Sequence, residues 1–497
     1  MPLHGYTKIE LTDVKTGKVE TQEKHNIVTN AVQNILSGFD RSLNLSALLA
    51  DKWYSNDSSS DGGITNLITA FYGGLYLYDT PLGSNPDTLF APAGAALVGT
   101  ALQNTANTGT NPCRGSYNQA ESSVDIKNGV VTFVYDFATN QANGTIASVC
   151  LTSPRGAYMC EADTVPAALR SCTYTFTQMG PDQRFLPKIK KFDYYSGHIA
   201  PIWADEEKQL LVMGRIIADG EQQLLELRFH DLQLNSLDLF DPGSDVPKEI
   251  KTLPLQGVSL RPKDDYGLYH RIYADVERGK LYVSSVKDDP VPPGEEMRVR
   301  EFDMNTFAYT DYHLTNTSGE RLSGRMSDHY GPCLAGTVYD GWLYMQAYLK
   351  KSGNKEDDYY RFRLTDSSQV EYIPTNNMGM RIITDAHDGR IYSFDGFDSS
   401  GGVPAGVLNT ATGKMYSTER RILWYSDSNV DHFRWLVIPT VGGGVSPLVT
   451  GRGESNYAYI RRMVRPNYLG TINDLDAPVE KTPDKTMKIT YTLRREA

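Results

Sequence analysis

The sequence predicts a mainly all-β protein: a β-rich, sandwich-like platform with one short helix, carrying an inserted β-propeller-like domain of about five or six blades. Three observations lead to this prediction. Strand-like alternation dominates the chain, a degenerate repeat fills its middle, and the segments before and after the repeat share a Thr-, Tyr- and Val-rich character that the middle lacks. A chain of 497 residues also exceeds the size of one average domain, so more than one unit is expected.

The N-terminal segment predicts a hairpin followed by the short helix. Residues 8–21 (KIELTDVKTGKVET) read as two strands around a Thr-Gly turn. Thr29 or Asn30 then offers an N-cap for a helix whose apolar face begins at Ala31. Further strands rich in Val, Tyr, Phe and Thr are expected at residues 74–78, 129–137, 145–151 and 487–493.

The middle of the chain repeats a pattern of strand, tight Asp/Gly turn and strand. It occurs at residues 202–205 (IWAD), 272–275 (IYAD) and 382–385 (IITD), and each copy is followed seven residues later by a strand centre. With two weaker copies, the strand centres fall at residues 212, 282, 344, 392 and 437. The last two intervals, 48 and 45 residues, match the roughly 40–50 residues of a four-stranded blade, whereas the first two need long loops. The spacing favours a propeller over a two-sheet sandwich whose turns resemble one another by coincidence.

The repeat region is expected to be an insertion. Residues 1–183 form an N-terminal platform, residues 184–466 form the propeller-like domain, and residues 467–497 return to the platform. A closed ring brings its own termini together, so it fits into a loop of another domain without distorting that domain.

Both ends of the chain carry a family resemblance. The segments 5–14 (GYTKIELTDV) and 25–31 (HNIVTNA), together with 475–493 at the C-terminus, resemble the ends of virion proteins of tailed phages that infect Gram-positive bacteria. The resemblance implies a virion component of the tail, baseplate or fibre, or a head decoration. It further implies attachment through the platform, other virion proteins as partners, and a homo-oligomer that follows the symmetry of its attachment site. No catalytic signature accompanies it, and the repeat region lies outside it.

Composition and local motifs exclude several classes of function. The net charge of −11 argues against nucleic-acid binding, which needs clustered Lys and Arg to displace counterions. The start has no apolar signal-peptide core, and the most apolar stretch, residues 89–102, is too short to span a bilayer. We therefore expect synthesis in the host cytoplasm, no membrane insertion, and a final location in the virion.

Catalytic and metal motifs are weak. The loop at residues 57–62 (DSSSDG) begins like a calcium loop, but Ile68 stands where a bidentate Glu is required. The five cysteines contain no CxxC pair. We expect no metal, no cofactor and no catalytic residues.

One set of loops favours ligand binding. Just before several repeats, a glycine is flanked by aromatic, His or Arg residues, and in a propeller these connections open on one face around the central channel. Tyr faces cover apolar C–H patches of sugars while polar groups fix hydroxyls. The candidate ligand-binding residues are Tyr195, His198, Tyr266, His270, His329, Tyr330 and Arg381. Alternatively, these side chains simply cap the blade cores.

Three functions stay open at this point. The leading hypothesis is a non-enzymatic virion protein whose propeller binds a host cell-surface polysaccharide or a neighbouring virion protein. The second is a tail-associated polysaccharide depolymerase, a glycosidase or lyase using carboxylates such as Asp265 or Asp328. The third is a purely architectural decoration of the head or collar.

Overall fold

The computed structural model divides the chain into two compact units. One comprises residues 1–39, 44–178 and 464–497, here called the platform; the other comprises residues 40–43 and 179–463, here called the propeller. The structure describes residues 3–33, 67–92, 95–107, 111–154, 188–190, 200–205, 208, 210–220, 222–231, 247–260, 270–287, 290–323, 327–328, 331–332, 336–347, 358–374, 382–387, 389–394, 406–411, 413–417, 433–437, 440–441, 445–452, 457–464 and 468–495.

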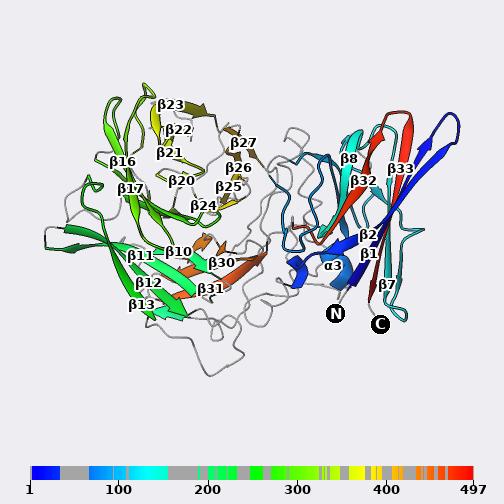
Figure 1. Cartoon of the computed structure of the whole chain (residues 1–497), viewed down its shortest axis with the longest axis horizontal. Coiled ribbons are helices and arrows are strands. Elements are labelled where there is room, and N and C mark those ends of the chain that lie inside the picture. The colour runs from blue at the N-terminus through cyan, green and yellow to red at the C-terminus, as the bar shows by residue number, and fades with distance from the viewer. Residues whose placement is uncertain are drawn as a thin grey trace. The chain divides into compact units, whose positions relative to one another are not determined.

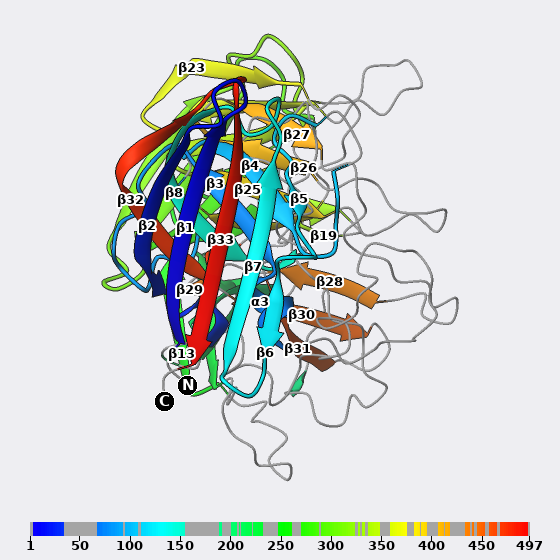
Figure 2. The same cartoon turned by 90° about the vertical axis from the view of Figure 1, so that its right-hand side faces the viewer.

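The platform is one curved antiparallel sheet (Figures 1 and 2). Its strands lie in the order β4-β3-β8-β32-β2-β1-β33-β7-β5, with β6 also paired to β7. Their bounds are β1 Leu3–Asp13, β2 Val19–Val28, β3 Gly74–Tyr78, β4 Leu97–Leu102, β5 Ser116–Tyr117, β6 Ser123–Asp125, β7 Val130–Phe137, β8 Gly144–Thr152, β32 Thr471–Lys481 and β33 Lys485–Arg495. Figure 2 shows β2, β1, β33 and β7 side by side.

The two edges of this sheet approach each other. The Thr100 N–H of β4 donates to the Cys113 carbonyl at 2.8 Å, and the Gly115 N–H, just before β5, donates to the Thr100 carbonyl at 2.8 Å. The sheet is therefore nearly closed into a barrel. The predicted β-rich platform is confirmed, and its sandwich-like character takes the form of a single sheet curled around one core.

The predicted helix begins where the N-cap signal placed it. Thr29 Oγ1 accepts the Ala31 N–H at 3.3 Å, and residues 31–33 are helical. The rest of that predicted helix lies outside the described residues. A second short helix, α3 at Leu67–Tyr72, was not predicted. In the described part of the chain no helix combines the length and apolarity needed to cross a membrane.

The propeller consists of successive four-stranded antiparallel sheets, or blades (Figure 1). In the first four blades the strands pair in chain order. Blades 1 and 2 contain β10 Ala200–Asp205, β11 Leu210–Asp219, β12 Gln222–Asp231 and β13 Glu249–Pro254, and then β14 His270–Asp275, β15 Lys280–Val286, β16 Glu296–Asp303 and β17 Tyr309–Thr315. Blade 3 contains β20 Val338–Tyr339, β21 Trp342–Gln346, β22 Tyr359–Arg363 and β23 Asp366–Ile373. Blade 4 contains β24 Ile382–His387, β25 Arg390–Phe394, β26 Gly406–Asn409 and β27 Lys414–Ser417.

The fifth blade closes the ring with a strand from the other end of the unit. Its order is β28-β30-β31-β9, where β28 is Phe433–Val437, β30 Val445–Arg452, β31 Tyr457–Val464 and β9 Lys188–Lys190. The short strand β29, Thr440–Val441, also pairs in parallel with β10 of blade 1. A small hairpin of β18 (Ser327–Asp328) and β19 (Gly331–Pro332) forms a separate two-stranded sheet, and β19 lies near β24 of blade 4 and β28 of blade 5. The prediction of an inserted propeller-like domain of about five or six blades is confirmed, with five in the described residues.

Apolar side chains between neighbouring blades form the core of the propeller. One cluster joins blades 1 and 2 and includes Trp203 and Phe302; a second joins blades 2 and 3 and includes Met297 and Phe362. A third cluster, rich in tyrosine, joins blades 3 and 4. Blades 2 and 3 thus bury both faces against their neighbours, and their second strands, β15 and β21, are buried along most of their length.

The repeat observed in the sequence maps onto the inner strands with two shifts of register. Asp205 and Asp275 both end an inner strand, where they pair with Leu210 and Lys280. Asp385 instead pairs with Tyr392 inside β24, beside a bulge, because the following turn is shorter. The centre expected at residue 437 lies in the first strand of blade 5 rather than the second, since this blade takes its outer strand from β9.

Candidate functional site

The predicted ligand face corresponds to the ends at which the inner strands begin. Of the seven candidate residues, His270 alone belongs to the described part of the chain, as the first residue of β14. The other six lie outside the described residues: Tyr195, His198, Tyr266, His329, Tyr330 and Arg381. Their convergence with His270 stays a prediction.

His270 belongs to a polar cluster with Ser259 and Ser285. Its Nε2 lies 3.0 Å from Ser259 Oγ, and β-sheet pairing places Ser285 directly opposite it. Ser285 Oγ accepts the Leu260 N–H at 3.0 Å, which ties the segment after blade 1 to the second strand of blade 2. Ser259 itself is held by a turn in which its N–H donates to the Leu255 carbonyl at 3.1 Å. The connection between blades 1 and 2 and two strands of blade 2 therefore meet at this polar cluster.

The exposure of these side chains indicates what the polar cluster can do. A Ser hydroxyl 3.0 Å from an imidazole is within the distance at which a base activates a nucleophile. His270 is only 6% exposed, however, whereas Ser259 is half-buried. The imidazole is thus placed to orient the Ser259 hydroxyl, and Ser259 is the more exposed of the two residues. This arrangement suits hydrogen bonding to a hydroxyl-rich ligand.

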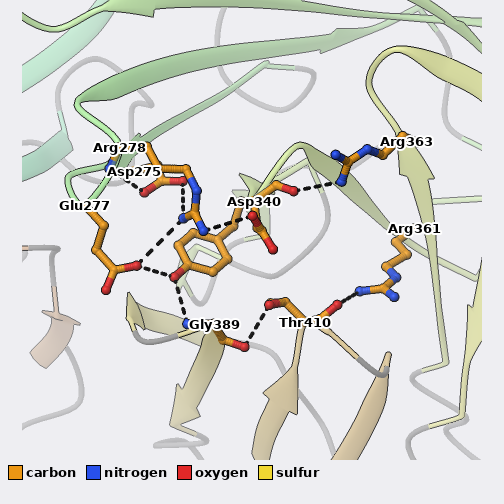
Figure 3. A network of polar contacts seen from close by, with 9 residues as sticks. Asp275, Glu277, Arg278, Asp340, Arg361, Arg363, Gly389 and Thr410 are labelled. Carbon is orange, nitrogen blue, oxygen red and sulfur yellow. Dashed lines mark hydrogen bonds and ion pairs between the residues drawn. The ribbon is translucent and has the colours of Figure 1, made fainter. Parts of the chain in front are cut away.

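The other end of the same inner strand carries a larger polar network, drawn in Figure 3. Asp275, which ends β14, lies five residues from His270, or about 17 Å along a strand. The Arg278 guanidinium binds Asp275 at 3.0 Å and Asp340 at 2.8 Å. It also lies 4.8 Å from the centre of the Tyr339 ring. These ion pairs connect the turn between β14 and β15 of blade 2 with the turn between β20 and β21 of blade 3.

Tyr339 extends this network to blade 4. Its hydroxyl donates to Glu277 Oε2 at 2.5 Å and accepts the Gly389 N–H at 3.3 Å. Burial and the neighbouring Glu277 carboxylate raise the pKa of Tyr339, so the hydroxyl keeps its proton. Burial also raises the pKa of Asp275, against the opposing effect of Arg278. We call this group the Tyr339 network; its members are Asp275, Glu277, Arg278, Tyr339, Asp340 and Gly389. Because these residues connect blades 2, 3 and 4, we assign the network a structural role.

Two buried arginines join blades in a similar way. Arg300 binds both carboxylate oxygens of Asp311 at 2.6 Å and donates to the carbonyls of Pro254 and Gln256 in the segment that ends blade 1. Arg361 binds Glu371 and donates to the carbonyl of Thr410 in blade 4 (Figure 3). The strand register places each arginine opposite an acidic residue of the next strand, Arg300 opposite Asp311 and Arg361 opposite Glu371.

Metal and carboxylate chemistry finds little support in the described chain. No cluster of three His, Cys, Asp or Glu side chains there could hold a metal ion. The calcium-like loop at residues 57–62 lies outside the described residues, as does Asp265. Asp328 is described only through its backbone pairing with Gly331.

Comparisons with known proteins return likeness at the level of structure alone. No family model matches the chain, and no curated protein matches its sequence. Among solved structures, polysaccharide lyase Uly1 is 10% identical over 89% of this chain and 99% of its own, with a TM-score of 0.29. The β-propeller domain of the Trilobed protease from Pyrococcus furiosus is 9% identical over 68% and 78%, with a TM-score of 0.24. The Penicillium chrysogenum α-L-arabinanase is 10% identical over 80% and 99%, with a TM-score of 0.26. Likenesses this distant carry no argument about activity.

Proposed function

We propose that the protein is a non-enzymatic structural component of a tailed-phage virion, in the tail, baseplate or fibre, whose propeller binds a host surface glycan. The proposal rests on the position of the virion-like segments in the platform sheet. Residues 5–14, 25–31 and 475–493 contribute β1, β2, β32 and β33, four neighbouring strands of the platform. β1 and β33 pair through eleven residues, from Leu3 opposite Arg495 to Asp13 opposite Lys485. The resemblance therefore belongs to one folded unit, as expected of an attachment module.

The propeller supports the binding half of the proposal. Inserted into the platform, a closed ring leaves the attachment strands intact and presents its loops independently of them. The polar cluster at the start of β14 offers a positioned hydroxyl, and weak binding per copy suffices when several copies act together.

The first test is binding by the full chain to wall teichoic acids and capsular polysaccharides extracted from Gram-positive bacteria. Sugar release is measured in the same samples. Saturable binding without release supports adhesion, whereas release of reducing ends would show a depolymerase. A lack of binding to every polysaccharide, by a protein that still assembles into virions, would favour an architectural role.

Two histidine variants on blade 2 locate the site. His270→Gln changes the polar cluster, and we expect it to weaken binding about tenfold, because a buried hydrogen-bond partner is worth about 1.5 kcal/mol. His313→Gln is the matched control: His313 lies on the outer strand β17, is 56% exposed, and contacts Glu296. Equal affinities of the two variants for the polysaccharide would show that the polar cluster takes no part in binding.

A further inference from the structure

The sequence contains two Asn-Gly pairs, Asn128-Gly129 and Asn143-Gly144. Both asparagines are exposed, and both precede a strand of the platform, β7 and β8 respectively. Both glycines have positive φ, +64° and +138°. The two asparagines are therefore alike in accessibility. The pairs differ in the φ of the glycine, in the hydrogen bond that the Gly129 N–H donates to the Ile126 carbonyl at 3.3 Å, and in the charge that surrounds the carboxamide.

The Asn143 carboxamide lies against a cation. Lys481 Nζ donates to Asn143 Oδ1 at 2.8 Å and to the Thr139 carbonyl at 3.3 Å, while Asn143 Nδ2 donates to the same carbonyl at 2.9 Å. The Asn128 carboxamide instead lies against an anion, because its Nδ2 donates to Asp125 Oδ2 at 2.6 Å. Negative charge building up on the side-chain oxygen is thus favoured at Asn143 and opposed at Asn128.

Lys481 is itself an unusual group. It is 1% exposed, at the last residue of β32, and burial lowers its pKa to about 8. Among the described residues its hydrogen-bond acceptors are the neutral oxygens of Thr139 and Asn143, with no carboxylate in ion-pair contact. The Asp484 carboxylate raises the pKa of Lys481 and so opposes the effect of burial, but it is not in ion-pair contact. A carboxylate at position 143 would lie directly against the ammonium and stabilise it further.

We propose that Asn143 is a site of spontaneous, Lys481-assisted conversion to aspartate, and that the new carboxylate pairs with Lys481. The Gly144 amide nitrogen attacks Asn143 Cγ and its proton passes through water to Nδ2, while the bond from Cγ to Nδ2 breaks and the protonated Nδ2 leaves as ammonia. Water then adds to Cγ of the resulting cyclic imide and opens it to the carboxylate. Addition of water at the main-chain carbonyl gives the isoaspartate isomer instead. Glycine permits the first step because no Cβ obstructs the approach of its nitrogen.

Lys481 assists the first step and benefits from the last. Its hydrogen bond to Oδ1 stabilises the oxyanion that forms when Cγ is attacked. After hydrolysis a carboxylate replaces a carboxamide of the same shape beside Nζ, which raises the pKa of Lys481 and removes the cost of its burial. The same conversion at Asn128 would place two carboxylates side by side at Asp125.

The test follows both sites in the intact full chain during storage at pH 7, below the pKa of about 8 of Lys481, so that the ammonium which assists the reaction stays charged. Peptide mass spectrometry measures replacement of the side-chain NH2 by OH at each asparagine. We expect Asn143 to convert at least about tenfold faster than Asn128, and Lys481→Met to abolish that excess. Lys485→Met is the control, because Lys485 bonds the exposed Glu20 at 3.2 Å and does not contact Asn143. Equal rates at the two asparagines, or an excess that survives Lys481→Met, would overturn the proposal.

A second measurement tests the ion pair without waiting for the reaction. Asn143→Asp should raise the melting temperature of the platform near neutral pH, while Asn128→Asp should not. A lower melting temperature for Asn143→Asp would contradict the pairing. A peptide that joins Lys481 to Asn143 after loss of ammonia would also overturn the proposal, because the lysine would then be the nucleophile.

Discussion

The platform and the propeller build β-sheets from opposite kinds of pairing. In the platform, strands from the two ends of the chain lie side by side, as β1 does with β33 and β8 with β32. In the first four blades of the propeller, every strand pairs with the strand before or after it in the chain. Pairing between strands that are neighbours in the chain produces a repeated pattern in the sequence. Pairing between strands hundreds of residues apart produces no such pattern.

The two units also differ in what holds their parts together. The interior of the platform is lined by apolar side chains such as Phe133, Leu75 and Ile489, all fully buried. Among the described residues the buried charged side chain of the platform is Lys481, at the end of β32. In the propeller, Arg300, Arg361 and Asp275 are buried where neighbouring blades meet. Apolar packing tolerates small shifts, but a buried charge needs its partners in place, so we expect the propeller to be more sensitive to the loss of single polar groups.

Removing Arg300 should have the largest effect. Arg300→Ala leaves Asp311 and two backbone carbonyls without their donor, and we expect the propeller to lose about 3–5 kcal/mol of stability. Tryptophan fluorescence during denaturant unfolding measures this, because Trp203, Trp342, Trp424 and Trp435 belong to the propeller unit. Arg298→Ala removes a partly exposed pair with Glu296 in the same strand and an exposed hydrogen bond to the Gly257 carbonyl at 3.0 Å, and should cost less than about 1 kcal/mol. Equal losses of stability in the two variants would contradict the expectation that the buried arginine matters more than the partly exposed one.

The matching change in the platform removes apolar volume. Ile489 is fully buried at the centre of β33, and Ile489→Ala should cost about 2–5 kcal/mol through lost burial and a cavity. Hydrogen exchange should then accelerate in β1 and β33 and stay unchanged in the blades. Acceleration spread evenly over both units would show that they unfold as one.

A smaller effect is expected from the hydroxyl of Tyr339. Tyr339→Phe keeps the ring over Arg278 but removes the bonds to Glu277 and the Gly389 N–H, so about 1–3 kcal/mol should be lost. Tyr309→Phe is the control, since Tyr309 is 51% exposed. Thermal unfolding monitored by fluorescence compares the two, and a larger loss at Tyr309 would contradict the structural role of the network.

The smallest expected effect is a pH dependence at Glu296. Hydrogen bonds from Arg298, and secondarily His313, lower the pKa of Glu296 to about 2. Because the folded pKa lies below the unfolded value of 4.5, the contribution is present above that pH and disappears as the pH falls towards 2. The side chain is 37% exposed, so Glu296→Gln should cost under about 1 kcal/mol at neutral pH. A stability difference that persists unchanged at pH 2 would refute this assignment.

The same contrast explains how much the sequence could predict. The repeat around Asp205 and Asp275 predicts blades because turn and strand recur locally. The near closure at Thr100 and the partnership of Arg361 with Thr410 depend on long-range register, which no local pattern contains. The glycine-containing loop before β14 predicts His270 as a candidate, whereas its partner Ser259 is a single serine in a connection and carries no signal in the sequence.

Hydrogen-exchange mass spectrometry of the full chain, with and without its best-binding surface polysaccharide, tests the central claim most directly. That claim assigns ligand recognition to the inner-strand entry of the propeller and attachment to the platform. It predicts slower exchange around Ser259, the start of β14 and the end of β15 when polysaccharide is bound, with β1, β2 and β33 unchanged. Slower exchange confined to the platform strands, or no change anywhere in a saturated sample, would contradict it.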